Sequence, residues 1–208
     1  MDALLQQVSA SFNQMLGWEL IAVILAIAYL LLIMRESIWG WPCAFISTLI
    51  YTLLFWNVNL LMESALSVYY IGMAVYGWWQ WRTGGSQHKG LNIHTWPIRN
   101  HLFIAVSLLA ISLVSGYLLS HNTQAAWPYL DSFTTWASVL TTYMVAKKVL
   151  ENWLYWILID SISMILYLER GLYLTALLFA GYLVICVFGY LNWRRTLLGE
   201  SETQSGTG

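Results

Sequence analysis

The sequence predicts an all-α membrane protein with seven transmembrane helices, arranged as two parallel three-helix bundles joined by a linker helix. Three observations favour this fold class: an apolar composition, seven apolar segments of membrane-spanning length, and an internal repeat. Of the 208 residues, 59% are hydrophobic and only 9% are charged, which is far from the composition of soluble domains. We therefore expect most of the chain to lie within a lipid bilayer.

A helix of about 20 apolar residues is long enough to cross a bilayer. Seven segments have this character, and they run from 17 to 34, 38 to 56, 61 to 81, 102 to 119, 129 to 146, 151 to 169 and 172 to 193. With seven spans, eight of the nine basic residues fall on one side, which the positive-inside rule assigns to the cytoplasm. The sequence thus predicts a membrane protein with its N-terminus outside and its C-terminus in the cytoplasm.

The segments between and beyond the spans complete the predicted organisation. We expect an interfacial N-terminal segment (1–16), a first bundle (17–82), a cytoplasmic loop (83–101), a linker helix (102–119), a second bundle (129–195) and a disordered cytoplasmic tail (196–208).

An internal repeat relates the two predicted bundles. When the chain is aligned with itself without gaps, "VYGWWQWR" at 75 to 82 lies over "VFGYLNWR" at 187 to 194. The same alignment places Trp41 on Trp153 and Thr48 on Asp160. Parallel repeats around a central site near the bilayer midplane are typical of transporters. The repeat therefore favours transport over a structural role.

Asp160 lies in the middle of an apolar span, where a carboxylate costs roughly 2.5 to 3.5 kcal/mol to insert. Helical spacing places four further residues on the same face of this span: Asn152, Trp156, Ser163 and Tyr167. Residues on other spans could complete a binding site with them: Glu63, Ser67, Tyr70, Thr48 and Trp136. Two alternatives remain open: Glu63 reaches the outer interface, or Asp160 hydrogen-bonds a neighbouring Ser or Thr and only holds helices together.

An acid among Trp and Tyr rings suits a flat, cationic or amphipathic heteroaromatic ligand. The sequence contains no pattern of a catalytic triad, a phosphate-binding loop, a metal site or a nucleic-acid interface, so we expect no enzyme activity, cofactor or metal. A membrane-embedded enzyme and a non-transporting membrane subunit are the less favoured alternatives.

Two stretches, "ENWLYWILIDSIS" followed by "LYLERGLYLTALLFAGYLV", and "LLMESALSVYYIGMAVYGWWQWR", resemble the Pnu vitamin transporters, a family that includes nicotinamide riboside and thiamine transporters. The resemblance covers about residues 36 to 82 and 146 to 195. It implies a seven-helix fold like that of full-length SWEET sugar transporters. It also places the family's sixth-span motif on Asn152, Trp153, Trp156 and position 160, and its third-span motif on Trp78 and Trp81.

The resemblance further implies facilitated diffusion of an unphosphorylated vitamin, which a cytosolic kinase then phosphorylates and traps. It also suggests a homotrimer in the bacterial inner membrane. At two positions the chain departs from the nicotinamide riboside branch, with Asp160 in place of an asparagine and Ser67 in place of a glutamine. Because a carboxylate pairs well with an aminopyrimidine, we expect thiamine as the substrate, with nicotinamide riboside as the alternative.

Overall fold

The structure is a computed structural model of the chain, and it describes residues 17–57, 61–85, 90–122, 127–169 and 171–205. These residues form seven helices: α2 (Gly17–Met34), α3 (Gly40–Asn57), α4 (Leu61–Thr83), α5 (Ile98–Asn122), α6 (Pro128–Ala146), α7 (Asn152–Glu169) and α8 (Tyr173–Ser205). Every expected span coincides with one of them, so the all-helical prediction is confirmed. The expected interfacial segment, 1–16, lies outside the described residues.

Helices α5 and α8 extend well beyond the predicted spans. Helix α5 begins at Ile98, directly after Pro97, so the preceding loop ends four residues earlier than expected. Helix α8 continues to Ser205, which corrects the expectation that the tail is disordered from residue 196 onward. This extension is stabilised at its start, where Leu197 packs against the core that contains Trp193. The following residues include no proline that would end the helix.

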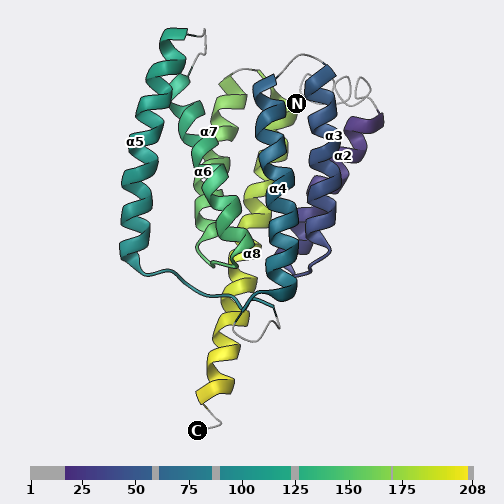
Figure 1. The fold of residues 1–208 in the computed structure, drawn as a ribbon, viewed down its shortest axis with the longest axis vertical. Coiled ribbons are helices and arrows are strands. Elements are labelled where there is room, and N and C mark those ends of the chain that lie inside the picture. The colour runs from purple at the N-terminus through teal and green to yellow at the C-terminus, as the bar shows by residue number, and fades with distance from the viewer. Residues whose placement is uncertain (1–16, 58–60, 86–89, 123–126, 170, 206–208) are drawn as a thin grey trace.

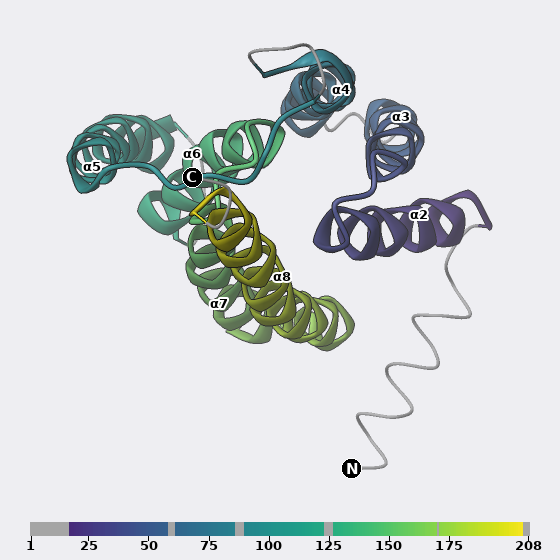
Figure 2. The same ribbon diagram turned by 90° about the horizontal axis from the view of Figure 1, so that it is seen from below.

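Six of the described helices form a closed ring in the order α2, α3, α4, α6, α7 and α8, with α8 returning to contact α2. Figure 2, viewed along the helices, shows α2 to α4 on one side and α6 to α8 on the other. Helix α5 lies outside the ring against α6 (Figures 1 and 2). Two seams, between α4 and α6 and between α2 and α8, therefore join the two sides.

The basic side chains gather at one end of the ring, which we call the basic end. It contains the C-terminal ends of α2, α4 and α6 and the N-terminal ends of α3, α5 and α7, and it faces downward in Figure 1. The described basic residues at or beside these helix ends are Arg35, Arg82, Arg99, Lys147, Lys148, Arg194 and Arg195.

The alignment that relates the two sequence halves also aligns the helices. The end of α2 corresponds to the end of α6, both ends of α3 correspond to those of α7, and the start of α4 corresponds to the start of α8. The turns after α2 and α6 match as well, because Glu36 and its counterpart Lys148 both have a positive φ, 56° and 55°. The next amide in each turn reaches back to the carbonyl five residues earlier, at 2.9 and 3.0 Å. This is the Schellman type of helix end.

The outer surface of the molecule is apolar, as a bilayer requires. Three helices contain stretches long and apolar enough to cross a membrane, Gly17–Met34, Ile98–Asn122 and Thr175–Gly199. Other ring helices carry buried polar residues, such as Asp160 on α7 and Thr142 on α6. Their large exposed side chains are nevertheless apolar, such as Leu158 and Val75. The chain is a multi-pass membrane protein.

The connection between α4 and α5 packs against the basic end. Ile93 is only 3% exposed and belongs to the core. His94 exchanges backbone hydrogen bonds with the turn after α6, accepting from the amide of Leu150 at 2.8 Å and donating to the carbonyl of Lys148 at 3.2 Å. The Trp96 amide donates to the Glu151 carboxylate at 3.3 Å. The loop thereby holds the turn between α6 and α7 in place.

Candidate functional site

Four tryptophans form a layer across the basic end of the ring. Trp41, Trp81, Trp153 and Trp193 are each at most 7% exposed. The rings of Trp41 and Trp81 meet edge to face at 5.5 Å, and the repeat-related rings of Trp153 and Trp193 do the same at 5.4 Å. Edge-to-face geometry is the favoured arrangement of aromatic pairs. The same packing unit therefore occurs once in each half.

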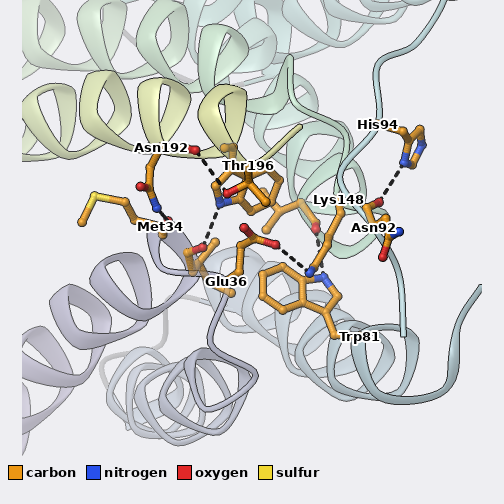
Figure 3. A network of polar contacts seen from close by, with 11 residues as sticks. Met34, Glu36, Trp81, Asn92, His94, Lys148, Asn192 and Thr196 are labelled. Carbon is orange, nitrogen blue, oxygen red and sulfur yellow. Dashed lines mark hydrogen bonds and ion pairs between the residues drawn. The ribbon is translucent and has the colours of Figure 1, made fainter. Parts of the chain in front are cut away.

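Hydrogen bonds connect this layer across the two halves. Trp81 donates its indole N–H to the carbonyl of Val145 at 3.2 Å, and Trp193 donates to the carbonyl of Ile33 at 3.1 Å (Figure 3). Val145 is the repeat counterpart of Ile33, so the two bonds are equivalent. Each half thus donates a hydrogen bond to the end of a helix in the other half, α6 in one case and α2 in the other.

An ion pair between the two halves lies beside the tryptophan layer. Lys148 Nζ is 3.0 Å from Glu36 Oε2, and the Lys148 ammonium also lies over the Trp81 ring at 4.7 Å (Figure 3). Both side chains are largely buried, with 11% and 22% of their surface exposed. Repeat-related positions contact each other directly here, which places the axis of the repeat between them.

A cavity of about 160 Å³ lies next to the tryptophan layer, lined by residues of both halves. Its aromatic lining residues are Tyr29, Trp41, Tyr70 and Trp156. Its hydroxyl-bearing lining residues are Ser47, Thr48 and Thr142, and its small ones are Ala26, Ala44 and Ala74. Among these described lining residues, no side chain is charged. Rings and hydroxyls suit a neutral or delocalised heteroaromatic ligand.

Helical spacing explains why these residues meet. On α3, Trp41, Ala44 and Thr48 follow one another by three and four positions, so one face of the helix points to the cavity. On α4, Tyr70 and Ala74 have the same relation. The small side chains of the lining alanines leave room for the cavity, and the aromatic rings form its walls. Trp41 lies one residue into α3, so the cavity begins directly at the tryptophan layer.

The hydroxyls of the lining differ in what they bind. Ser47 donates to the carbonyl of Ala22 at 2.7 Å, which ties α3 to α2. Thr142 donates to the carbonyl of Ser138 at 2.8 Å within its own helix and keeps its lone pairs for another donor. The buried indole nitrogen of Trp41 has no acceptor among the described residues. Trp41 therefore contributes its ring to the cavity wall, and its N–H lies buried.

The structure brings three predicted site residues into the cavity wall, namely Thr48, Tyr70 and Trp156. Thr142 was expected among the polar residues of its span, whereas Tyr29, Trp41 and Ser47 were not predicted. A signal for Tyr29 exists in the sequence, because Ala22, Ala26 and Tyr29 share one face of α2 and small residues mark the packing face of a membrane helix.

Asp160 does not line the cavity, although it lies one turn beyond Trp156 on the same face of α7. It is 4% exposed, and its Oδ2 accepts a hydrogen bond from the Cys186 thiol of α8 at 3.7 Å. Its repeat counterpart Thr48 does line the cavity, and Cys186 is the counterpart of the lining residue Ala74. The acid therefore occupies the position in the second half that corresponds to the cavity wall in the first.

Asn152 and Trp153 belong to the packed core at the basic end rather than to the cavity. Asn152 is fully buried and donates its side-chain amide to the carbonyl of Val149 at 2.6 Å, in the turn that precedes α7. Trp153 packs against Gly189, where a Cβ would lie 2.8 Å from the indole ring. Their position in the sequence motif therefore has a structural explanation.

The remaining predicted residues are distributed over the fold. Ser67 and Ser163 are buried on α4 and α7, outside the cavity lining. Tyr167 contacts the ring of Phe179 at 5.1 Å. Trp136 is 37% exposed and donates to Ser115 of α5 at 3.2 Å, so it faces the outer helix. Glu63 lies near the start of α4, and its side chain is outside the described part of the structure.

Metal coordination finds no support in the described part of the chain. No group of three or more His, Cys, Asp or Glu side chains there is close enough to hold an ion. Both described cysteines are free, Cys43 and Cys186.

Comparison with known proteins yields consistent relatives. The sequence model of the family described as "Nicotinamide mononucleotide transporter" matches residues 16 to 195. The riboflavin/roseoflavin transporter RibM of Streptomyces davaonensis is 23% identical over 88% of this chain and 87% of its own. The nicotinamide riboside transporter PnuC of Escherichia coli is 22% identical over 90% of this chain and 87% of its own.

A solved structure resembles the fold over nearly its whole length. The crystal structure of the vitamin B3 transporter PnuC superposes with a TM-score of 0.71 at 20% identity, over 92% of this chain and 86% of that one. The helical architecture described above is therefore an established membrane fold.

Proposed function

Because the chain belongs to the nicotinamide mononucleotide transporter family, we propose that it carries an unphosphorylated vitamin across the bacterial inner membrane, with nicotinamide riboside as the first candidate. The PnuC relatives are named as nicotinamide riboside transporters, and RibM is named as a riboflavin/roseoflavin transporter. Each of these compounds joins a flat heteroaromatic ring to a polyhydroxylated chain or sugar. We expect the same ligand class here.

The observation that carries the proposal is the chemistry of the cavity between the two halves. Four aromatic side chains offer rings against which a heteroaromatic ligand can pack, and three hydroxyls offer hydrogen bonds for a ribose. A delocalised positive ring gains cation–π attraction of about 0.5 to 2 kcal/mol from each well-placed aromatic face. This combination fits a nucleoside better than it fits a phosphorylated nucleotide, because the described lining contains no basic side chain.

Thiamine becomes the second candidate. We expected it because Asp160 replaces an amide, but the Asp160 carboxylate is directed to Cys186 and does not line the cavity. Thiamine also lacks a pair of adjacent hydroxyls that could form hydrogen bonds with Ser47, Thr48 and Thr142. It stays a candidate because Asp160 lies on the same face of α7 as Trp156, one turn away.

We further propose that transport is facilitated diffusion by alternating access between two parallel three-helix bundles, α2 to α4 and α6 to α8, with α5 as the linker in a SWEET-like arrangement. The tryptophan layer and the Glu36–Lys148 pair would then form the cytoplasmic gate. Opening it requires the α4/α6 and α2/α8 seams to separate. The N-terminus would lie outside and the C-terminus in the cytoplasm, as the basic end suggests. Trapping by a cytosolic kinase and assembly as a homotrimer belong to the same proposal.

Binding to the purified protein tests the substrate assignment. Isothermal titration calorimetry in detergent should give saturable binding of nicotinamide riboside and no binding of nicotinamide mononucleotide, because the cavity offers no partner for a phosphate. Thiamine and riboflavin are titrated in parallel. Tight binding of thiamine alone would restore our first expectation. Binding of none of the four compounds would refute the assignment to this ligand class.

A further inference from the structure

A second hollow of about 260 Å³ lies on the outside of the ring at the basic end, between the end of α2 and the middle of α8. It is lined by Met34 and Arg35 after α2, and by Phe188, Leu191, Asn192 and Arg195 of α8. Asn192 donates its side-chain amide to the carbonyl of Met34 at 2.8 Å and so joins the two walls (Figure 3). We call this hollow the α2/α8 groove.

The chemistry of the α2/α8 groove changes along its length. On α8 the four lining residues are spaced by three, one and three positions and therefore share one face of the helix. The face begins with Phe188 and Leu191, which are 59% and 40% exposed, and ends with Arg195. On α2 the order is the same, from Met34 to Arg35. The groove thus runs from an apolar end, facing the bilayer interior, to a basic end at the membrane surface.

The two arginines are available to an anion. Among the described residues, Glu36 is the acid adjacent to Arg35 in sequence, and its carboxylate already pairs with Lys148 at 3.0 Å. Neither guanidinium has a carboxylate within ion-pair distance in the described structure. Two arginines on facing walls can hold a phosphate group with several charge-assisted hydrogen bonds.

The other half of the ring supplies an internal comparison. The counterparts of Phe188 and Arg35 are Tyr76 and Lys147, at the seam between α4 and α6. There Tyr76 stacks on Tyr143 at 6.2 Å, and the Lys147 ammonium lies over both rings, 5.3 and 5.8 Å from their centroids. At that seam the Lys147 ammonium makes cation–π contacts with the protein's own aromatic rings. In the α2/α8 seam Leu31 stands in place of Tyr143, and neither Arg35 nor Arg195 lies over the ring of Phe188 in the described structure.

We propose that the α2/α8 groove binds an anionic phospholipid of the inner leaflet. Its phosphate lies between Arg35 and Arg195, and its acyl chains extend along Phe188 and Leu191. Basic pockets between helices at the cytoplasmic surface are the usual sites for such headgroups. Because the groove spans the seam between the two halves, the lipid contacts both of them.

Native mass spectrometry of the detergent-solubilised protein, titrated with phosphatidylglycerol or with phosphatidylcholine, measures the preference directly. The unmodified protein should retain phosphatidylglycerol at least tenfold more tightly, as expected for two surface charges. The double variant Arg35→Gln/Arg195→Gln should lose that preference. The matched control is Arg82→Gln/Arg194→Gln, which removes the same charge at the same end of α4 and α8 but outside the groove. It should keep the preference.

Equal loss in both double variants would overturn the proposal in favour of a nonspecific charge effect. Should the groove variant unfold, Arg35→Lys/Arg195→Lys keeps the charge but not the planar donors, and it should weaken the preference only in part. Glycerol 3-phosphate tests the source of the anion. If it displaces phosphatidylglycerol at equal concentration, the groove is a soluble-phosphate site and the lipid proposal fails.

Discussion

The indole rings of Trp81 and Trp193 lie with their centroids 6.0 Å apart at the basic end, and each residue is the repeat counterpart of the other. Each donates a hydrogen bond to a helix end in the opposite half, at 3.2 and 3.1 Å. The contact between the halves is therefore symmetric in geometry, although the sequences differ around it.

The first prediction follows from this symmetry. Trp81→Phe and Trp193→Phe each remove one interhalf hydrogen bond, while the Val145 and Ile33 carbonyls keep the bonds from the amides of Lys148 and Glu36 at 3.0 and 2.9 Å. Each loss should therefore cost about 0.5 to 1.5 kcal/mol. The two losses should agree within about 0.5 kcal/mol, because the environments match. Because the rings touch, the double variant should show coupling rather than additivity. Thermal unfolding in detergent measures all three variants, and a large difference between the single variants would contradict the equivalence.

The second prediction concerns the glycines that face the tryptophan layer. A Cβ at Gly77 would overlap the indole of Trp41, and one at Gly189 would lie 2.8 Å from Trp153. Gly77→Ala and Gly189→Ala should each destabilise the protein by about 1 to 3 kcal/mol through overpacking. Gly72→Ala and Gly181→Ala are matched controls on the same helices, with nothing within 4 Å of the added carbon. They should be neutral or stabilising by up to about 1 kcal/mol in the same thermal unfolding measurement.

Much of this fold could be predicted from the sequence, because long apolar segments in a membrane protein have few alternatives to helices. The repeat was also visible in the sequence. Trp41 packs against Gly77, and their counterparts Trp153 and Gly189 pack in the same way, so the same residue types are required in both halves. The length of α8 was not visible, because its polar end has the composition of a disordered tail. Only the packing of Leu197 distinguishes the start of that extension.

The candidate site was predicted less completely. A polar face on α7 identified Trp156 and Asp160, but helical spacing alone cannot tell which end of a face meets the cavity and which meets the core. Asn152 therefore turned out to donate to the turn that precedes its own helix. Tyr29 was missed because a single tyrosine in an apolar helix is equally typical of the membrane interface.

The third prediction tests the cavity. Thr142→Val keeps the shape of the side chain and removes a hydroxyl from the lining, so nicotinamide riboside should bind about fivefold to tenfold more weakly. Thr141→Val is the control, because Thr141 is fully buried and bonds the carbonyl of Ala137 at 2.7 Å, outside the cavity. Its affinity should stay within twofold of the unmodified protein by calorimetry. Equal weakening in both variants would show that Thr142 does not face the ligand.

The fourth prediction separates the two candidate vitamins. Asp160→Asn removes the charge and keeps the shape, so a ligand held by the carboxylate should lose at least tenfold in affinity by calorimetry, whereas nicotinamide riboside should bind as before. Cys186→Ala is the companion variant, since it removes the thiol that donates to Asp160 at 3.7 Å and leaves the acid intact. If Asp160→Asn unfolds while Cys186→Ala is stable and binds normally, the acid has a structural role. Loss of nicotinamide riboside binding in a folded Asp160→Asn protein would contradict our placement of the site.

The pairing of Glu36 with Lys148 has a consequence for assembly. These positions are equivalent in the two halves and meet on the axis that relates them. Two copies of the first half would place two carboxylates there, and two copies of the second half would place two ammonium groups, each combination repelling at close range. Attraction arises only when unlike halves meet. A single difference in charge between duplicated segments thus favours association within the chain over exchange of halves between neighbouring chains during insertion into the membrane.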